Sequence, residues 1–179
     1  MISRERERER ERDDYEQLLK YHTAERDRSY QGKIVIHARD IPLKQNRQAL
    51  RRKYMWPSQY TGEPSPTALD GWTVFVQTIL QHSGRHRHQG GLVIYILEGE
   101  GYSMVDGERH EWKAGDLLLL PLKPGGVDHQ HFNKDDEKPV KWIAFINVPI
   151  FTWGSSEMVQ VEDHPDFKEE PSDSGSARR

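Results

Sequence analysis

The residues best suited to chemistry in this chain are two pairs of histidines: His86 with His88, and His129 with His131. Side chains at positions i and i+2 of a β strand point to the same face of a sheet. The first pair would therefore aim two imidazoles at one point, as two ligands of one metal ion must do. The second pair has the same spacing and could complete the coordination sphere from an adjacent strand. The pattern predicts a metal site built on two strands.

Short strands are predicted throughout the middle of the chain. From Gly71 onward, apolar runs end at turn residues, and Asp106-Gly107 between two of them is a strong hairpin signal. We expect strands at residues 72–81, 92–97, 101–105, 108–112, 116–120 and 141–148, and an earlier one at 33–37. Many short strands with no helical pattern between them predict an all-β fold, an antiparallel sandwich or barrel of the jelly-roll kind.

The predicted strand at residues 92–97 has a buried and an outward face. Leu92, Ile94 and Ile96 share the inward parity of the histidines and should form an apolar floor beneath the metal. On other strands, four further residues are candidates to line the cavity: Gln77, Gln81, Trp142 and Phe145. For Trp142 and Phe145, packing in the core is the preferred interpretation.

The two ends of the chain differ from this middle. Residues 3–14 alternate arginine with acids and predict a marginal, solvated helix, whereas residues 15–28 carry a narrow apolar stripe that includes Leu18 and Leu19 and predict an ordered helix. After Trp153 the chain is polar and acidic, and residues 171–176 are too polar to fold alone, which predicts a disordered tail. We therefore divide the chain into a charged extension (1–32), a barrel domain (33–153) and a polar tail (154–179).

Residues 45–54 are rich in basic side chains and contain Arg47, Arg51, Arg52 and Lys53. Two interpretations are open: a solvated connection pinned by Trp56, or a basic surface near the entrance to the substrate site.

Charge and composition exclude several classes of protein. The 179 residues carry a formal net charge of -3, so no overall basic field attracts nucleic acid. The chain has no cysteine, which excludes disulfides and thiolate ligands and is compatible with a reducing cytoplasm. No apolar run approaches the roughly 20 residues of a membrane span, and the N-terminus lacks the apolar core of a signal peptide. We expect a soluble cytoplasmic protein that binds neither nucleic acid nor membrane.

Two blocks of the sequence resemble the two conserved motifs of the cupin superfamily. The segments GRHRH and LEGEG, at residues 84–88 and 97–101, are similar to the first motif, and Gly115-Asp116, Pro121, His129 and Asn133 are similar to the second. The resemblance implies a single cupin barrel.

Within the cupins, the chain is similar to gentisate 1,2-dioxygenase and its relatives through HRHQGGLVIYILEGEGYSMVDGERH, DHQHFN and the later NVPI. Most cupins carry a glutamate ligand four residues after the second histidine, where this chain has Leu92. The gentisate-type enzymes lack that glutamate and hold iron(II) with three histidines. Carried over residue by residue, the resemblance implies His86, His88 and His129 as the metal ligands.

Three neutral imidazoles would leave the double positive charge of a divalent metal uncompensated. Such a site favours an anionic bidentate ligand, and a hydroxylated aromatic acid that chelates through carboxylate and phenolate oxygens fits this demand while leaving room for dioxygen. Iron(II) is the natural metal, although manganese, zinc, nickel and copper also accept histidine ligands. His131 faces the same way as His129 and is either a catalytic proton donor or acceptor, or a structural histidine. His82 and His110 are expected at the surface.

The leading hypothesis is a single-domain iron(II) dioxygenase that acts on a gentisate- or salicylate-like acid in the catabolism of aromatic compounds. Two alternatives stay open: a metal-dependent decarboxylase or isomerase, and a non-catalytic cupin that binds a small acid. A single barrel also leaves a sheet edge and an apolar outer face with Val93, Tyr95 and Leu97, surfaces that proteins usually cover. We therefore expect a homodimer, and we expect residues 33–56 to contribute to its interface.

Overall fold

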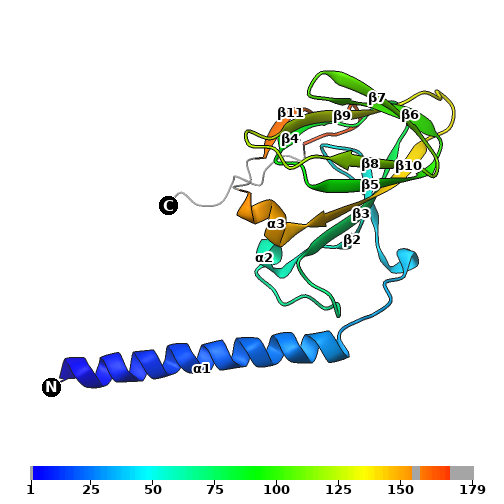
Figure 1. Ribbon diagram of the computed structural model, residues 1–179. Helices are drawn as coiled ribbons and strands as arrows, with labels where there is room; N and C mark the ends of the chain where they lie inside the picture. The colour runs from blue at the N-terminus through cyan, green and yellow to red at the C-terminus, as the bar shows by residue number, and fades with distance from the viewer. Residues whose placement is uncertain (1, 155–157, 170–179) are drawn as a thin grey trace, which may run out of the picture.

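Two antiparallel β sheets face each other across a shared interior, and one long helix lies apart from them (Figure 1). The computed structural model describes residues 2–154 and 158–169. One sheet has six strands in the order β1-β2-β3-β10-β5-β8, and the other has five in the order β11-β4-β9-β6-β7. This is the all-β, single-barrel architecture that the strand pattern predicts.

The strands are β1 (Leu43–Gln45), β2 (Leu50–Met55), β3 (Trp72–Ile79), β4 (Arg85–His88), β5 (Leu92–Glu98), β6 (Glu100–Val105), β7 (Glu108–Lys113), β8 (Leu117–Leu120), β9 (Val127–Asn133), β10 (Val140–Asn147) and β11 (Val159–Glu162). The helices are α1 (Ile2–Gln31), α2 (Ser58–Thr61), α3 (Val148–Trp153) and one turn of 3-10 helix, Ala38–Asp40. No described helix is both long and apolar enough to cross a membrane.

Local sequence patterns explain the central strands. On β5, Leu92, Ile94 and Ile96 are 4%, 0% and 1% exposed and lie in the core, as their alternation predicts. The β6–β7 hairpin turns at Asp106-Gly107, where φ is 49° and 86°. Positive φ at both positions is what a tight two-residue hairpin requires, and it favours this Asp-Gly pair. The strands predicted from residue 72 onward are all present, with ends shifted by one or two residues.

The strand predicted at residues 33–37 is absent. Lys33 forms an isolated bridge with Thr67, and Ile34 and Val35 are 86% and 63% exposed. The β-branched side chains favour an extended backbone, but a strand is stabilised by neighbours and by a face to bury, and this segment has neither. Residues 45–54 include β2, which pairs with β3 inside the six-stranded sheet, so this segment is not the solvated connection that was one of its two interpretations.

The C-terminal segment also differs from the expected polar tail. β11 pairs with β4, and beyond it Arg47 binds Asp163 and Glu169 at 2.7 Å each. Residues 158–169 therefore belong to the barrel, because partners distant in sequence compensate for their polarity. Residues 171–176, for which disorder was predicted, lie outside the described residues.

Helix α1 runs from Ile2 to Gln31, so it joins the marginal helix predicted at residues 3–14 and the ordered helix predicted at 15–28 into one element. Arginine and glutamate have high helix propensity, which supports the longer helix. The apolar stripe does not lie on the barrel: Tyr15, Leu18 and Leu19 are 62%, 49% and 50% exposed. Helix α1 is attached to the rest of the chain through Arg28, whose Nη1 donates to the carbonyl oxygens of Thr67 and Ala68 at 3.2 and 2.9 Å.

The outer face of the six-stranded sheet presents apolar side chains to solvent. Val93, Tyr95 and Leu97 of β5 are 38%, 40% and 42% exposed, and Leu117 and Leu119 of the neighbouring β8 are 60% and 65% exposed. A contiguous apolar surface of this kind is usually covered by a partner.

We expect wild-type protein to be a homodimer at micromolar concentration, with this face and residues 33–56 contributing to the interface. Leu119→Glu should then give a monomer, because dimerisation would bury an unpaired carboxylate. Leu69→Glu, the same change at a 56% exposed leucine in a loop, is the control and should stay dimeric. Light scattering measures the mass of each, and a monomeric wild type would refute the prediction.

Candidate metal centre

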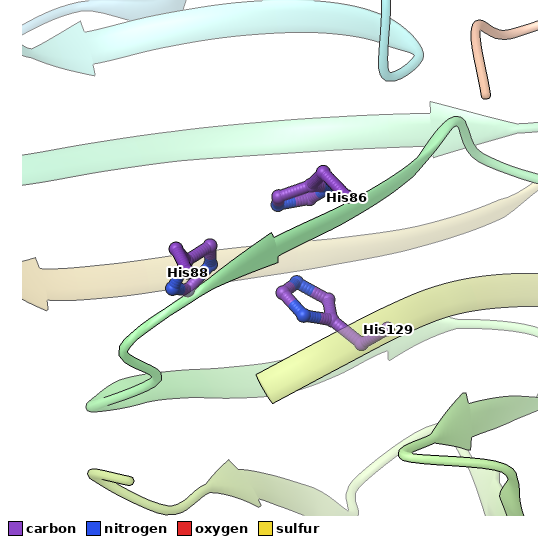
Figure 2. A group of neighbouring side chains, drawn as sticks. All are labelled: His86, His88 and His129. Carbon is purple, nitrogen blue, oxygen red and sulfur yellow. The ribbon is translucent and has the colours of Figure 1, made fainter. Parts of the chain in front are cut away.

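Two neighbouring antiparallel strands carry the candidate metal ligands. β4 presents His86 and His88 on one face, and β9 places His129 directly opposite His86 in the register. The ring centroids of His86 and His129 are 4.2 Å apart, and that of His88 lies 5.1 Å from His86 and 4.7 Å from His129. One ring nitrogen from each residue lies within 4.8 Å of the other two. Figure 2 shows the three rings gathered around a common space, which can hold a single metal ion.

The backbone beside β4 keeps its histidine pair in place. Gly90, in the turn that follows, has φ of 85°, and an added Cβ would lie 1.8 Å from the carbonyl oxygen of Pro121. Only glycine fits there. On the face away from the rings, Arg85 Nε donates to Asp128 Oδ1 at 2.7 Å and ties β4 to β9.

Two ring nitrogens of the group are buried without a hydrogen-bond partner. His129 Nδ1 lies 3.1 Å from the carbonyl oxygen of Val127 and donates to it, which leaves the lone pair on Nε2. Among the described residues, neither His129 Nε2 nor His86 Nδ1 has a partner. A buried polar atom without a partner costs free energy. A metal ion is a partner that an unpaired ring nitrogen can accept, so the donor set fits one.

The rings are neutral at neutral pH, as metal ligands must be. Burial lowers the pKa of His129 to about 4, and burial together with the nearby His129 lowers the pKa of His88 to about 3. Burial and the other histidines hold the pKa of His86 well below its ordinary value. The backbone N–H of Gly90 donates to His88 Nδ1 at 3.0 Å. A neutral ring has one lone pair, so a metal at Nε2 of His88 would replace this hydrogen bond.

A cavity of about 360 Å³ opens beside the three rings and lies between the sheets. This volume falls within the range of small-molecule sites, about 300–1,000 Å³. Leu92 lines the cavity at the position where a glutamate ligand would stand, and no aspartate or glutamate is among the described lining residues. Phe151 of α3 also lines it, with its ring 5.3 Å from that of His88. The site is therefore apolar apart from its histidines and a few polar groups from the other sheet.

His131 lies in the same cavity but outside the group of three. It is 2% exposed, its ring centroid is 5.5 Å from that of His129, and burial holds its pKa well below the ordinary value. Its Nδ1 lies 2.7 Å from Ser103 Oγ, which accepts a hydrogen bond from Trp112 Nε1 at 2.8 Å. The Ser103 hydroxyl hydrogen is then free to bond His131 Nδ1, leaving the ring proton on Nε2. A catalytic role for His131 stays a prediction.

The other candidates divide between the cavity and the exterior. Gln77 and Trp142 line the cavity, whereas Phe145 pairs with Val93 on the outer face of the sheet. Gln81 is exposed beyond the end of β3, and the side chain of His110 is 48% exposed. His82 is half-buried, with Nδ1 2.9 Å from the carbonyl oxygen of Ser83, and does not line the cavity.

The sequence places Arg51 in a basic segment that was one candidate for a surface near the substrate entrance, whereas Tyr60 and Met158 are among the lining residues that it does not single out. Arg51 belongs to β2, whose run of basic residues hid the strand, and Met158 precedes β11 in the expected tail. No local periodicity marks these positions, because long-range pairing brings them to the cavity.

Residues 75–146 match the cupin domain family. Gentisate 1,2-dioxygenase from a Ralstonia species is 41% identical over 66 residues, which are 36% of this chain and 18% of that enzyme. Acireductone dioxygenase from Yarrowia lipolytica is 32% identical over 127 residues, 63% of this chain and 70% of that one. Among solved structures, salicylate 1,2-dioxygenase from Pseudoaminobacter salicylatoxidans with gentisate has a TM-score of 0.51 at 20% identity, covering 75% of this chain and 37% of that one.

The two-sheet barrel and its group of three histidines define a cupin-type metal-site architecture. The chain belongs to the cupin family and resembles the gentisate dioxygenase-like members, as its motifs imply. It spans less than a fifth of the length of the gentisate dioxygenases that it matches. The three-histidine group and the dioxygenase relatives together imply a metal cofactor.

Proposed function

We propose that this protein is a non-haem iron(II) dioxygenase that acts on a hydroxylated aromatic acid, with the metal held by His86, His88 and His129. The observation that carries the proposal is the group of three neutral imidazoles, two buried and one half-buried, whose ring nitrogens lie within 4.8 Å of one another, with two ring nitrogens lacking a partner. When bound there, iron(II) would supply the redox chemistry with dioxygen that the side chains lack.

The charge of the site supports an anionic substrate. Neutral histidines do not offset the charge of a divalent ion, and no carboxylate is among the described residues that line the cavity. Phe75, Trp142 and Phe151 line it as well and offer flat apolar surfaces to an aromatic ring. An aromatic acid with a hydroxyl group satisfies both demands.

His131 is the group that we assign to proton transfer. Ser103 fixes its ring from behind, and the ring lies in the cavity rather than within the group of three. Outside the group of three, His131 is the remaining imidazole that lines the cavity, so we assign to it a proton exchanged with the substrate during reaction.

The relatives agree with dioxygenase chemistry but differ in substrate. Gentisate dioxygenase from a Ralstonia species matches this chain over 66 residues at 41% identity, which favours an aromatic acid. Acireductone dioxygenase from Yarrowia lipolytica matches over 127 residues, which supports an acireductone as a second candidate substrate.

Oxygen uptake by the iron(II)-loaded protein tests the proposal. We expect consumption of dioxygen with gentisate, salicylate or a related acid, and none with metal-free protein. Uptake with an acireductone alone would favour the second candidate. Carbon dioxide release without oxygen uptake would indicate a decarboxylase, and binding of the acids without turnover would indicate a non-catalytic cupin.

A further inference from the structure

The wall of the cavity formed by the six-stranded sheet carries a row of polar groups that the metal centre does not use. In the register of β2, β3 and β10, Arg51 pairs with Gln77, and Gln77 pairs with Trp142. Cross-strand partners project to the same face of a sheet with Cβ atoms about 5 Å apart. All three residues line the cavity, so the row faces the space beside the histidines.

Arg51 holds a positive charge without a counter-ion. Its guanidinium carbon lies 5.6 Å from the ring centroids of both Trp56 and Phe75, and burial lowers its pKa. Among the described residues, no hydrogen bond or ion pair reaches its side chain. Arginine keeps its charge in proteins, and a partly buried charge is stabilised when it is paired. The five N–H groups of Arg51 therefore have no acceptor among the described residues.

Gln77 is the second group without a partner. It is 4% exposed, and no hydrogen bond to its amide is found among the described residues. Buried amides are almost always hydrogen-bonded. Since Gln77 lines the cavity beside Arg51, the missing partner of both groups lies in the cavity.

The cavity itself supplies no anion to these groups. Arg51 is the one arginine or lysine among the described lining residues, and none of them is an acid. A ligand must therefore bring the negative charge. A carboxylate matches the forked donors of a guanidinium, and such charge-assisted pairs are the stronger hydrogen bonds.

We propose that Arg51 and Gln77 form a carboxylate-binding subsite on the sheet that faces the histidines, and that the ligand of this cavity is an aromatic monocarboxylate bound by its acid group there. The inference rests on the proposed function for the orientation of the ligand. With the carboxylate at Arg51 and Gln77, the hydroxyl end of the substrate faces His86, His88 and His129.

Calorimetric titration of metal-free protein tests this subsite without any requirement for turnover. The probes are matched pairs that differ only in the acid group: benzoate and benzamide, salicylate and salicylamide, gentisate and gentisamide. Wild-type protein should bind at least one acid roughly 10- to 100-fold more tightly than its amide, the range of a charge-assisted hydrogen bond. Arg51→Gln should remove this preference while changing affinity for the amide by no more than about twofold.

Arg52→Gln is the matched control, because it removes the same charge one residue away on the strand, at a position that pairs with Val76 and does not line the cavity. It should leave the preference intact. Arg51→Lys should keep part of it, since lysine retains the charge but not the fork, and this variant also guards against misfolding of Arg51→Gln.

The proposal is overturned if no acid binds more tightly than its amide to wild-type protein, or if Arg52→Gln weakens acid binding as much as Arg51→Gln does. An Arg51-dependent preference supports the subsite even where the iron-loaded protein consumes no oxygen. Failure of the subsite is therefore distinguishable from failure of the proposed dioxygenase activity.

Discussion

Protein with His86, His88 or His129 changed to alanine will lose most of its bound metal, whereas wild-type protein will hold about one divalent ion per chain. Each of these residues offers one nitrogen to a group of three, so each substitution removes a third of the protein ligands. Loss of a residue that hydrogen-bonds to a metal-binding side chain costs about 10- to 100-fold in metal affinity or activity. Loss of the metal-binding side chain itself should cost more. Elemental analysis of protein after dialysis measures the content.

Two further histidines serve as comparisons for this series. His110→Ala changes a half-exposed histidine on β7 and should keep full metal content and activity. His131→Ala should keep metal but lose activity. If His131→Ala lost metal as completely as the other three, the site would have four histidine ligands. Unchanged metal content after any one of the three substitutions would remove that residue from the site.

Leu92→Glu should bind metal at least as tightly as wild type while turnover collapses. Leu92 lines the cavity beside the histidines, so a carboxylate there can become a fourth protein ligand. It would lower the charge of the site by one unit and take a coordination position that the substrate needs. Titration with manganese(II) and oxygen uptake with an aromatic acid measure the two effects separately.

The stability of Leu92→Glu gives a second measurement. Leu92 is 4% exposed, and an uncompensated buried charge costs about 3–5 kcal/mol, or about 10 °C in melting temperature for a chain of this size. Metal-free mutant should melt below wild type by that amount and recover when iron(II) or manganese(II) is added. Leu92→Gln, similar in shape but uncharged, is the control and should show no such recovery. Metal binding together with wild-type turnover by Leu92→Glu would contradict the idea that an uncompensated three-histidine site recruits the anionic substrate.

Several features of this protein were predictable because they depend on neighbours in the chain. The alternation of β5 predicts its buried and exposed faces, and Asp106-Gly107 predicts the hairpin through the φ values that only such residues adopt easily. The spacing of His86 and His88 places both on one side of β4, since a strand repeats every two residues. The β-rich fold and the candidate ligands therefore follow from short-range patterns, together with the cupin motifs.

Other features depend on which strands pair, and the amino-acid sequence alone did not reveal them. His129 and His131 are two residues apart on one strand, so both point to the same face of the sheet. The β4–β9 register places His129 opposite His86 and leaves His131 beside Ser103. Strand β11 is held by β4 and Arg47 despite its polar surroundings in the chain.

The position of Arg51 at the cavity was likewise not determined by the sequence alone. Its basic neighbours left two interpretations open, a solvated connection and a basic surface near the substrate entrance. Pairing of β2 with β3 decides between them, because it places Arg51 at the cavity next to Gln77. Periodicity determines which way a side chain faces within its own strand. Its partner across the barrel is decided by non-local pairing and by burial of the shared core, and these exist only in the tertiary structure.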